Sequence, residues 1–160
     1  MSLIDDLGSL YLASRLERLS ENLKKDAILI FKEHFCDIKY KWYPPLYTIH
    51  IKSVISVVEL ANELSYAHPT IIETLKEMEN EKLIRSAVDK TDNRKRMLTL
   101  TSKGKRMILK ILPITRAFEK AVTDLIQSKH HLLKSIEDVE SKLEKENFFD
   151  RVNRVIKQSK

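Results

Sequence analysis

Apolar residues recur at steps of three and four along the first 35 residues, and charged residues lie between them. This spacing puts the apolar side chains on one helical face and predicts a long amphipathic helix over residues 3–35, with Gly8 as a candidate break. Pro44 and Pro45 end the pattern, because proline lacks an amide donor and biases its predecessor away from helical geometry. A short helix over residues 46–51 is expected to begin at these prolines.

The central part of the chain has the pattern of two short helices around a tight turn. Residues 53–58 are rich in β-branched side chains, and residues 59–64 return to helical spacing. A second helix should begin at Pro69, where the missing N–H is harmless in the first turn. Its inner face should hold Ile71, Leu75 and Met78, and its outer face His68, Thr70, Ile72, Glu73 and Lys76. Together the two segments predict a helix-turn-helix.

A β-hairpin is expected next, with strands over residues 85–88 and 97–100 and a polar, basic turn over 89–93. Thr101 or Ser102 can cap a further helix that runs to Ile126, with Pro113 inside it as a predicted kink. One last helix is predicted over residues 129–156. Its apolar stripe consists of Leu132, Leu133, Ile136, Val139, Leu143, Phe148, Val152 and Val155.

The predicted fold is therefore mainly α with a small β-hairpin. The terminal helices are longer than the core of a single domain requires, and such helices often pair with a second copy of the chain. We accordingly expect a dimer.

Composition limits the class of protein. The chain has 160 residues, 42% of them hydrophobic, and only 2 glycines, which excludes a disordered, collagen-like or turn-rich all-β protein. Its one cysteine, Cys36, cannot form an intrachain disulfide. The acidic start and the lack of a run of about 20 apolar residues predict a cytoplasmic protein with no membrane partner.

Charge is concentrated around the predicted hairpin. The whole chain has a net charge of +6, whereas residues 82–106 alone hold nine basic and two acidic side chains, a net +7. A basic hairpin beside a helix-turn-helix suits a phosphate backbone, although a solvated loop has the same composition. The helix after Pro69 has the opposite sign, with Lys76 against four glutamates. These carboxylates should repel phosphate, but a glutamate can also accept a hydrogen bond from cytosine.

Four sequence segments resemble the winged helix of MarR-type transcriptional regulators. They are Glu59-Leu60-Ala61-Asn62-Glu63-Leu64, His68-Pro69-Thr70-Ile71, Leu83-Ile84-Arg85, and the run from Asp92-Asn93-Arg94-Lys95-Arg96 to Leu100-Thr101-Ser102-Lys103-Gly104. The wing and the Leu-Thr-x-Lys-Gly after it are the most specific parts. The resemblance implies one domain over 1–160: an N-terminal dimerisation helix over 1–43, a winged helix-turn-helix lobe over 44–106 and C-terminal dimerisation helices over 107–160.

The resemblance also implies a function. Proteins of this family are homodimeric, sequence-specific regulators, often repressors, that bind a palindromic operator in double-stranded DNA. Arg94 matches the wing arginine and Asp92 its partner acid, while Ile72, Glu73 and Lys82 depart from the family's usual residues. The predicted DNA-contacting residues are His68, Pro69, Thr70, Ile72, Glu73, Lys76, Lys90, Arg94, Lys95 and Arg96. An ion pair with Asp92 is the alternative role of Arg94, and helix capping that of His68 and Thr70.

Other candidate sites are weaker. Tyr47, His50 and Phe118 could line a pocket for a small-molecule effector, although core packing explains them equally. Cys36 could sense oxidants, but an inert, half-buried thiol is the simpler interpretation. We expect no metal site, no cofactor and no enzymatic activity, since phosphate-binding glycine loops and paired metal ligands are missing from the sequence. Two alternative functions stay open: a winged-helix adapter that binds proteins without an operator, and a redox sensor based on Cys36.

Overall fold

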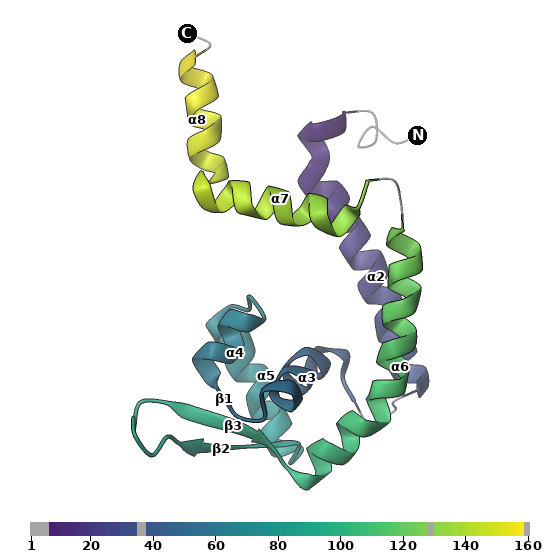
Figure 1. Cartoon of the computed structure of the whole chain (residues 1–160), viewed down its shortest axis with the longest axis vertical. Helices are drawn as coiled ribbons and strands as arrows, with labels where there is room; N and C mark the ends of the chain where they lie inside the picture. The colour runs from purple at the N-terminus through teal and green to yellow at the C-terminus, as the bar shows by residue number, and fades with distance from the viewer. Residues whose placement is uncertain (1–6, 35–37, 128–129, 159–160) are drawn as a thin grey trace. The chain divides into compact units, whose positions relative to one another are not determined.

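The fold was determined as a computed structural model that describes residues 7–34, 38–127 and 130–158. The chain divides into two compact units, residues 1–111 and 112–160. The elements in chain order (Figure 1) are η1 Gly8–Tyr11, α2 Leu12–His34, η2 Tyr40–Trp42, α3 Tyr43–Lys52, β1 Ile55–Ser56, α4 Val57–Glu63, α5 His68–Asn80, β2 Ile84–Val88, β3 Arg96–Leu100, α6 Ser102–Ile126, α7 Leu132–Lys145 and α8 Phe148–Gln158.

The first unit begins with the predicted amphipathic helix. α2 confirms it over residues 12–34, and a short 3-10 turn precedes it at Gly8, whose φ of 55° is left-handed. Ala27 and Phe31 are buried near the C-terminal end of α2. Nearer the N-terminal end of α2, Leu16 and Leu23 are exposed. The apolar stripe of α2 is therefore longer than the part of it that the first unit buries.

Two local signals set the next helices. α3 begins at Tyr43, earlier than predicted, because Pro44 and Pro45 are accommodated in its first turn. α4 begins after a capping box, in which the Ser56 hydroxyl accepts from the Glu59 amide at 3.2 Å and the Glu59 carboxylate accepts from the Ser56 amide at 2.9 Å. The Ser56 amide, which donates to the Glu59 carboxylate, and then the Ser56 hydroxyl beside it lower the pKa of Glu59.

The predicted hairpin is confirmed and gains a third strand. The antiparallel sheet has the order β1-β3-β2, with Ile55 opposite Leu98 and Ile84 opposite Leu100. In Figure 1 the β2–β3 hairpin extends beyond the two-residue β1. Buried residues of the sheet and helices form one core, which includes Leu46, Ile49, Leu60, Ile71, Met78, Leu83, Leu98, Ile108 and Ile111.

A tight joint connects α5, β2 and α6. The chain leaves α5 through Lys82, a non-glycine residue at φ 56°. The Thr101 hydroxyl donates to the Lys82 carbonyl at 2.6 Å and accepts from the Gly104 amide at 3.1 Å. A Cβ on Gly104 would lie 2.1 Å from the Leu83 carbonyl oxygen, so this close approach requires glycine.

α6 confirms the predicted helix from Ser102 to Ile126 and continues through Pro113. The second unit then departs from the prediction of one helix over residues 129–156, which is wrong. Two helices, α7 and α8, take its place, with Glu146 in an extended conformation between them. Residues 128 and 129 lie outside the described part of the chain.

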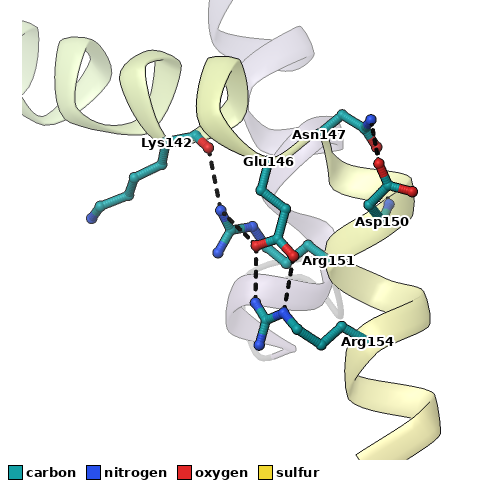
Figure 2. Close-up of polar contacts among 6 residues, drawn as sticks. All are labelled: Lys142, Glu146, Asn147, Asp150, Arg151 and Arg154. Atoms are coloured by element: carbon teal, nitrogen blue, oxygen red, sulfur yellow. Dashed lines mark hydrogen bonds and ion pairs between the residues drawn. The ribbon is translucent and has the colours of Figure 1, made fainter.

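The helical phase explains this correction. Between Leu143 and Phe148 the apolar stripe makes a step of five residues, and five residues turn an α-helix about 140° past a full turn. A continuous helix would place the apolar halves on nearly opposite sides. Instead, the Asn147 side chain accepts from the Asp150 amide at 2.9 Å and begins α8 (Figure 2).

Salt bridges reinforce the corner between α7 and α8 (Figure 2). The two Glu146 oxygens accept from the Arg154 guanidinium at 2.9 Å each, and Arg151 lies 3.4 Å from the same carboxylate. Arg151 also donates to the Lys142 carbonyl at 3.2 Å. The hydrogen bond from Arg154 lowers the pKa of Glu146.

None of the helices within the described ranges combines the length and apolar character needed to cross a membrane.

Candidate nucleic-acid interface

α5 has one buried and one exposed face, as the sequence predicted. Ile71, Leu75 and Met78 are at most 5% exposed, and the Thr74 hydroxyl, also buried, donates to the Thr70 carbonyl at 3.0 Å. The exposed face contains every predicted DNA-contacting residue of this helix: His68, Pro69, Thr70, Ile72, Glu73 and Lys76. The helix therefore presents a polar surface of two turns to solvent, with Ile72 as its apolar member.

The hairpin places four predicted contact residues beside this helix: Lys90, Arg94, Lys95 and Arg96, all exposed. Its turn is ordered by Asp89, which accepts from the Thr91 hydroxyl and from the Thr91 and Asp92 amides. Those hydrogen bonds, led by the hydroxyl, lower the pKa of Asp89. The wing is thus a defined loop, which keeps its cations at fixed places.

Arg94 lies at the tip with 93% of its side chain exposed. Its Nε donates to Asp92 at 3.3 Å, and the Arg94 amide donates to the same carboxylate oxygen at 3.1 Å. The ion pair considered as the alternative to DNA contact is therefore present. It leaves the guanidinium at the surface, where an exposed pair is weak and screened by salt.

A groove of about 870 Å³ separates α5 from the hairpin. Three predicted residues of the helix and three of the wing line it together: His68, Ile72, Lys76, Arg94, Lys95 and Arg96. Pro69, Thr70, Glu73 and Lys90 are exposed but do not line the groove. Helix face and wing thus border one concave surface within a single compact unit.

Arg96 connects the two walls of the groove. Its Nη2 donates to both oxygens of Glu79 on α5, at 3.0 and 2.8 Å, and its Nε donates to the Ser86 hydroxyl at 2.7 Å. A guanidinium held by two atoms of one carboxylate has a defined orientation. Arg96 therefore fixes the wing against the helix.

A second set of ion pairs engages Glu77 on the opposite flank of α5. Its carboxylate accepts from Lys41 at 2.7 Å, from the Trp42 indole at 2.9 Å and from Lys39 at 3.2 Å. These donors, Lys41 first, lower the pKa of Glu77 to about 2. These contacts attach α5 to η2. Helical spacing did not predict this role of Glu77, because its partners lie 35 to 38 residues away in the chain.

The acidic character of α5 is largely compensated. Glu77 and Glu79 are paired as described, and Glu81 lies 3.6 Å from Lys103, whose ammonium also donates to the Glu81 carbonyl. Within the part of the chain that the structure describes, no ion pair engages Glu73. The repulsion expected from four glutamates is thus reduced to that of one outward carboxylate.

The predicted effector residues belong to both units of the chain. Tyr47 and His50 lie on α3 with ring centroids 6.5 Å apart, and Phe118 belongs to the second unit. His50 also borders a groove of about 530 Å³ in the first unit. Cys36 lies outside the described residues, and the described ranges contain no group of three or more His, Cys, Asp or Glu side chains suited to a metal.

The helices α4 and α5 form a helix-turn-helix, and they pack beside a three-stranded sheet whose β2–β3 hairpin is the wing. This arrangement defines a winged-helix protein. Neither a protein-family model nor a curated protein matches the sequence. Solved structures do: a MarR mutant from E. coli in complex with operator DNA is 16% identical with a TM-score of 0.65, the alignment covering 89% of this chain and 99% of that one.

Two further regulators have the same fold. The M. tuberculosis transcriptional regulator MOSR in complex with DNA is 19% identical, with a TM-score of 0.70 over 83% of this chain and 96% of that one. Bordetella bronchiseptica BpsR, whose DNA binding is regulated by 6-hydroxynicotinic acid, is 14% identical, with a TM-score of 0.61 over 80% and 98%. The chain therefore has the winged-helix fold of MarR-type regulators.

Proposed function

We propose that this protein is a transcriptional regulator that binds double-stranded DNA sequence-specifically, with α5 in the major groove and the β2–β3 wing over the adjacent backbone. The observation that carries the proposal is the position of the exposed α5 face beside the basic wing on one concave surface. An α-helix fits the major groove, while cations on a neighbouring hairpin neutralise phosphates.

The roles of the individual residues follow from their contacts. His68, Pro69 and Thr70 form the first turn of α5, where amide groups favour a phosphate. Lys90, Arg94 and Lys95 supply cations from the wing, and Arg94 reaches the minor groove. Arg96 holds the wing in position through Glu79, and this positioning is its main contribution.

We further propose a homodimer on a palindromic operator. α7 and α8 contain no buried residue among those described, while Val139, Leu143 and Val152 are exposed. A second copy of the chain would cover such stripes and place two α5 helices on successive major grooves about 34 Å apart. A dimer on an operator excludes other proteins from the same DNA, so repression is the proposed mode.

Control by a small molecule is the proposed regulation. The likeness to BpsR, whose DNA binding responds to 6-hydroxynicotinic acid, supports it. An effector that binds one spacing of the two DNA-binding units better than another would change the fit to the operator.

The test is a binding series with DNA fragments from upstream of the protein's own gene, measured by fluorescence anisotropy over a range of salt concentrations. We expect a preferred fragment and a steep loss of affinity with salt. Arg94→Ala should weaken binding to all duplexes about tenfold and reduce the salt slope by about one, with unchanged thermal stability. Lys24→Ala on α2, which removes the same charge elsewhere, should change neither.

The alternative adapter function makes the opposite prediction. An adapter would bind no fragment preferentially, and Arg94→Ala would leave its weak DNA binding as it was. That result would overturn the proposed function. The pairing of Glu77, Glu79 and Glu81 removes much of the reason for preferring an adapter. Within α5, Glu73 is the glutamate for which the described residues show no ion pair.

A further inference from the structure

We propose that Glu73 is a specificity-determining residue that reads a cytosine in the major groove by accepting a hydrogen bond from its N4 amino group. The inference rests on the proposed DNA-binding function and adds to it the identity of a base in the half-site. It explains why a DNA-binding helix would present a carboxylate to DNA at all.

Glu73 lies on the side of α5 that faces away from the core. The buried residues Ile71, Leu75 and Met78 define the inner side of α5. At 100° per residue, the opposite side is the row Pro69, Glu73, Lys76 and Asn80, with steps of four, three and four. Glu73 therefore lies at the middle of the outward face, in the second turn of the helix, where a recognition helix contacts base edges.

Glu73 differs from the other carboxylates of its helix. Glu77 is held by Lys41, Lys39 and Trp42, and Glu79 is held by Arg96. Within the described chain no ion pair engages Glu73, although Lys76 lies one turn away on the same face. The sequence and fold compensate the charges that flank the outward face and leave its central carboxylate available.

Base chemistry then selects the partner. A carboxylate is an acceptor only, so it is repelled by the O6 and N7 of guanine and by the O4 of thymine. On its own major-groove edge, cytosine presents the N4 amino donor beside a C5–H group and no acceptor, whereas adenine presents its N6 donor beside its own N7 acceptor. Cytosine is accordingly the base that Glu73 recognises. Opposite the other three bases the Glu73 carboxylate would lack a donor or be repelled by a base acceptor.

The experiment is selection of bound duplexes from a randomised library with the full-length protein, followed by affinity measurements on the enriched sequence. We expect a cytosine at one fixed position of each half-site. Changing that pair should weaken binding by about 5- to 150-fold. Glu73→Gln should shift the preference there to adenine, because an amide both donates to N7 and accepts from N6. Glu73→Ala should remove the preference at this position alone.

Lys76→Ala is the matched control, since it alters the same face and should affect a different position of the half-site. Circular dichroism should show that each variant folds, since the substituted positions are exposed. An enriched sequence identical for the wild type, Glu73→Gln and Glu73→Ala would overturn this inference and leave the proposed function intact. So would a uniform gain in affinity for all duplexes in Glu73→Ala, which would make the carboxylate only repulsive. A library without any enriched sequence would overturn both.

Discussion

Lys82 shows how one backbone position affects the interface. It turns the chain out of α5 at φ 56°, a left-handed conformation that is unfavourable for a residue with a Cβ. The following joint depends on this turn, because Thr101 bonds both the Lys82 and Leu83 carbonyls, at 2.6 and 3.1 Å. The orientation of α5 relative to the wing is thus set where the sequence lacks the glycine that the geometry favours.

Lys82→Gly should therefore stabilise the protein. Relief of the left-handed strain favours the folded state by about 1–2 kcal/mol, and the greater freedom of an unfolded glycine offsets about half of that. We expect a net increase of about 0.5–1 kcal/mol in the free energy of unfolding, measured by urea denaturation. Lys90→Gly, at an exposed position without a positive φ, should give no increase. Equal effects of the two changes would contradict the role of Lys82.

At the scale of single elements, hydrophobic spacing predicted most of the fold. α2, α5, the hairpin and α6 follow from local periodicity, because each buries one face against the core of the first unit. The error at Glu146 arose from treating the apolar positions of α7 and α8 as one stripe, when the five-residue step between Leu143 and Phe148 breaks the phase. Helical spacing predicted the outward residues of α5 as well as its buried ones, because the two sets lie on opposite sides of the same helix.

The contacts that fix α5 were not predictable from spacing. In the sequence, nothing distinguishes Glu77 and Glu79 from Glu73, because all three are glutamates within one helix. The partners of Glu77 and Glu79 come from η2 and from β3. Only the tertiary fold decides which carboxylate is paired. The acidic composition of α5 therefore suggested a more negative outward surface than the structure presents.

The attachment of α5 to η2 predicts a pH dependence of stability. The pKa of Glu77 is about 2 in the folded chain against an ordinary value of 4.5, so the unfolded chain binds a proton more readily. The stabilisation from Glu77 is then fully present above about pH 4.5 and is lost as the pH falls towards 2. In Glu77→Gln this contribution is missing at every pH. Urea denaturation from pH 2 to 7 should show the two proteins converging at acidic pH; a constant difference would contradict the proposed pairing.

The beginning of α8 predicts an effect in the second unit. Asn147 caps α8 through the Asp150 amide, and loss of such a cap typically costs about 1 kcal/mol. Asn147→Ala should accelerate hydrogen exchange of the amides in the first turn of α8. Asn153→Ala places the same substitution within α8, where alanine favours helix, and should slow exchange slightly. Faster exchange in both variants would indicate general loosening of the helix rather than loss of the cap.

At the scale of the whole molecule, the second unit has little hydrophobic core of its own among the described residues. α7 and α8 are amphipathic but contain no buried residue among those described, whereas the first unit has a well-packed core. Exposed apolar stripes on two successive helices are typical of a surface that a partner covers. A second copy of the chain would both cover them and supply the second α5 for a palindromic site.

This proposal predicts that assembly and DNA binding fail together. Val139→Glu places a charge on the apolar stripe of α7 and should convert the dimer to a monomer, seen by sedimentation equilibrium. A monomer binds one half-site, so the loss of bivalent binding should reduce affinity for the palindromic operator by about 100-fold or more, while affinity for an isolated half-site stays the same. Ser141→Glu adds the same charge to the polar face of α7 and should change neither property. If Val139→Glu dissociates the protein yet leaves operator affinity intact, each copy acts independently, and the two-fold arrangement on DNA is wrong.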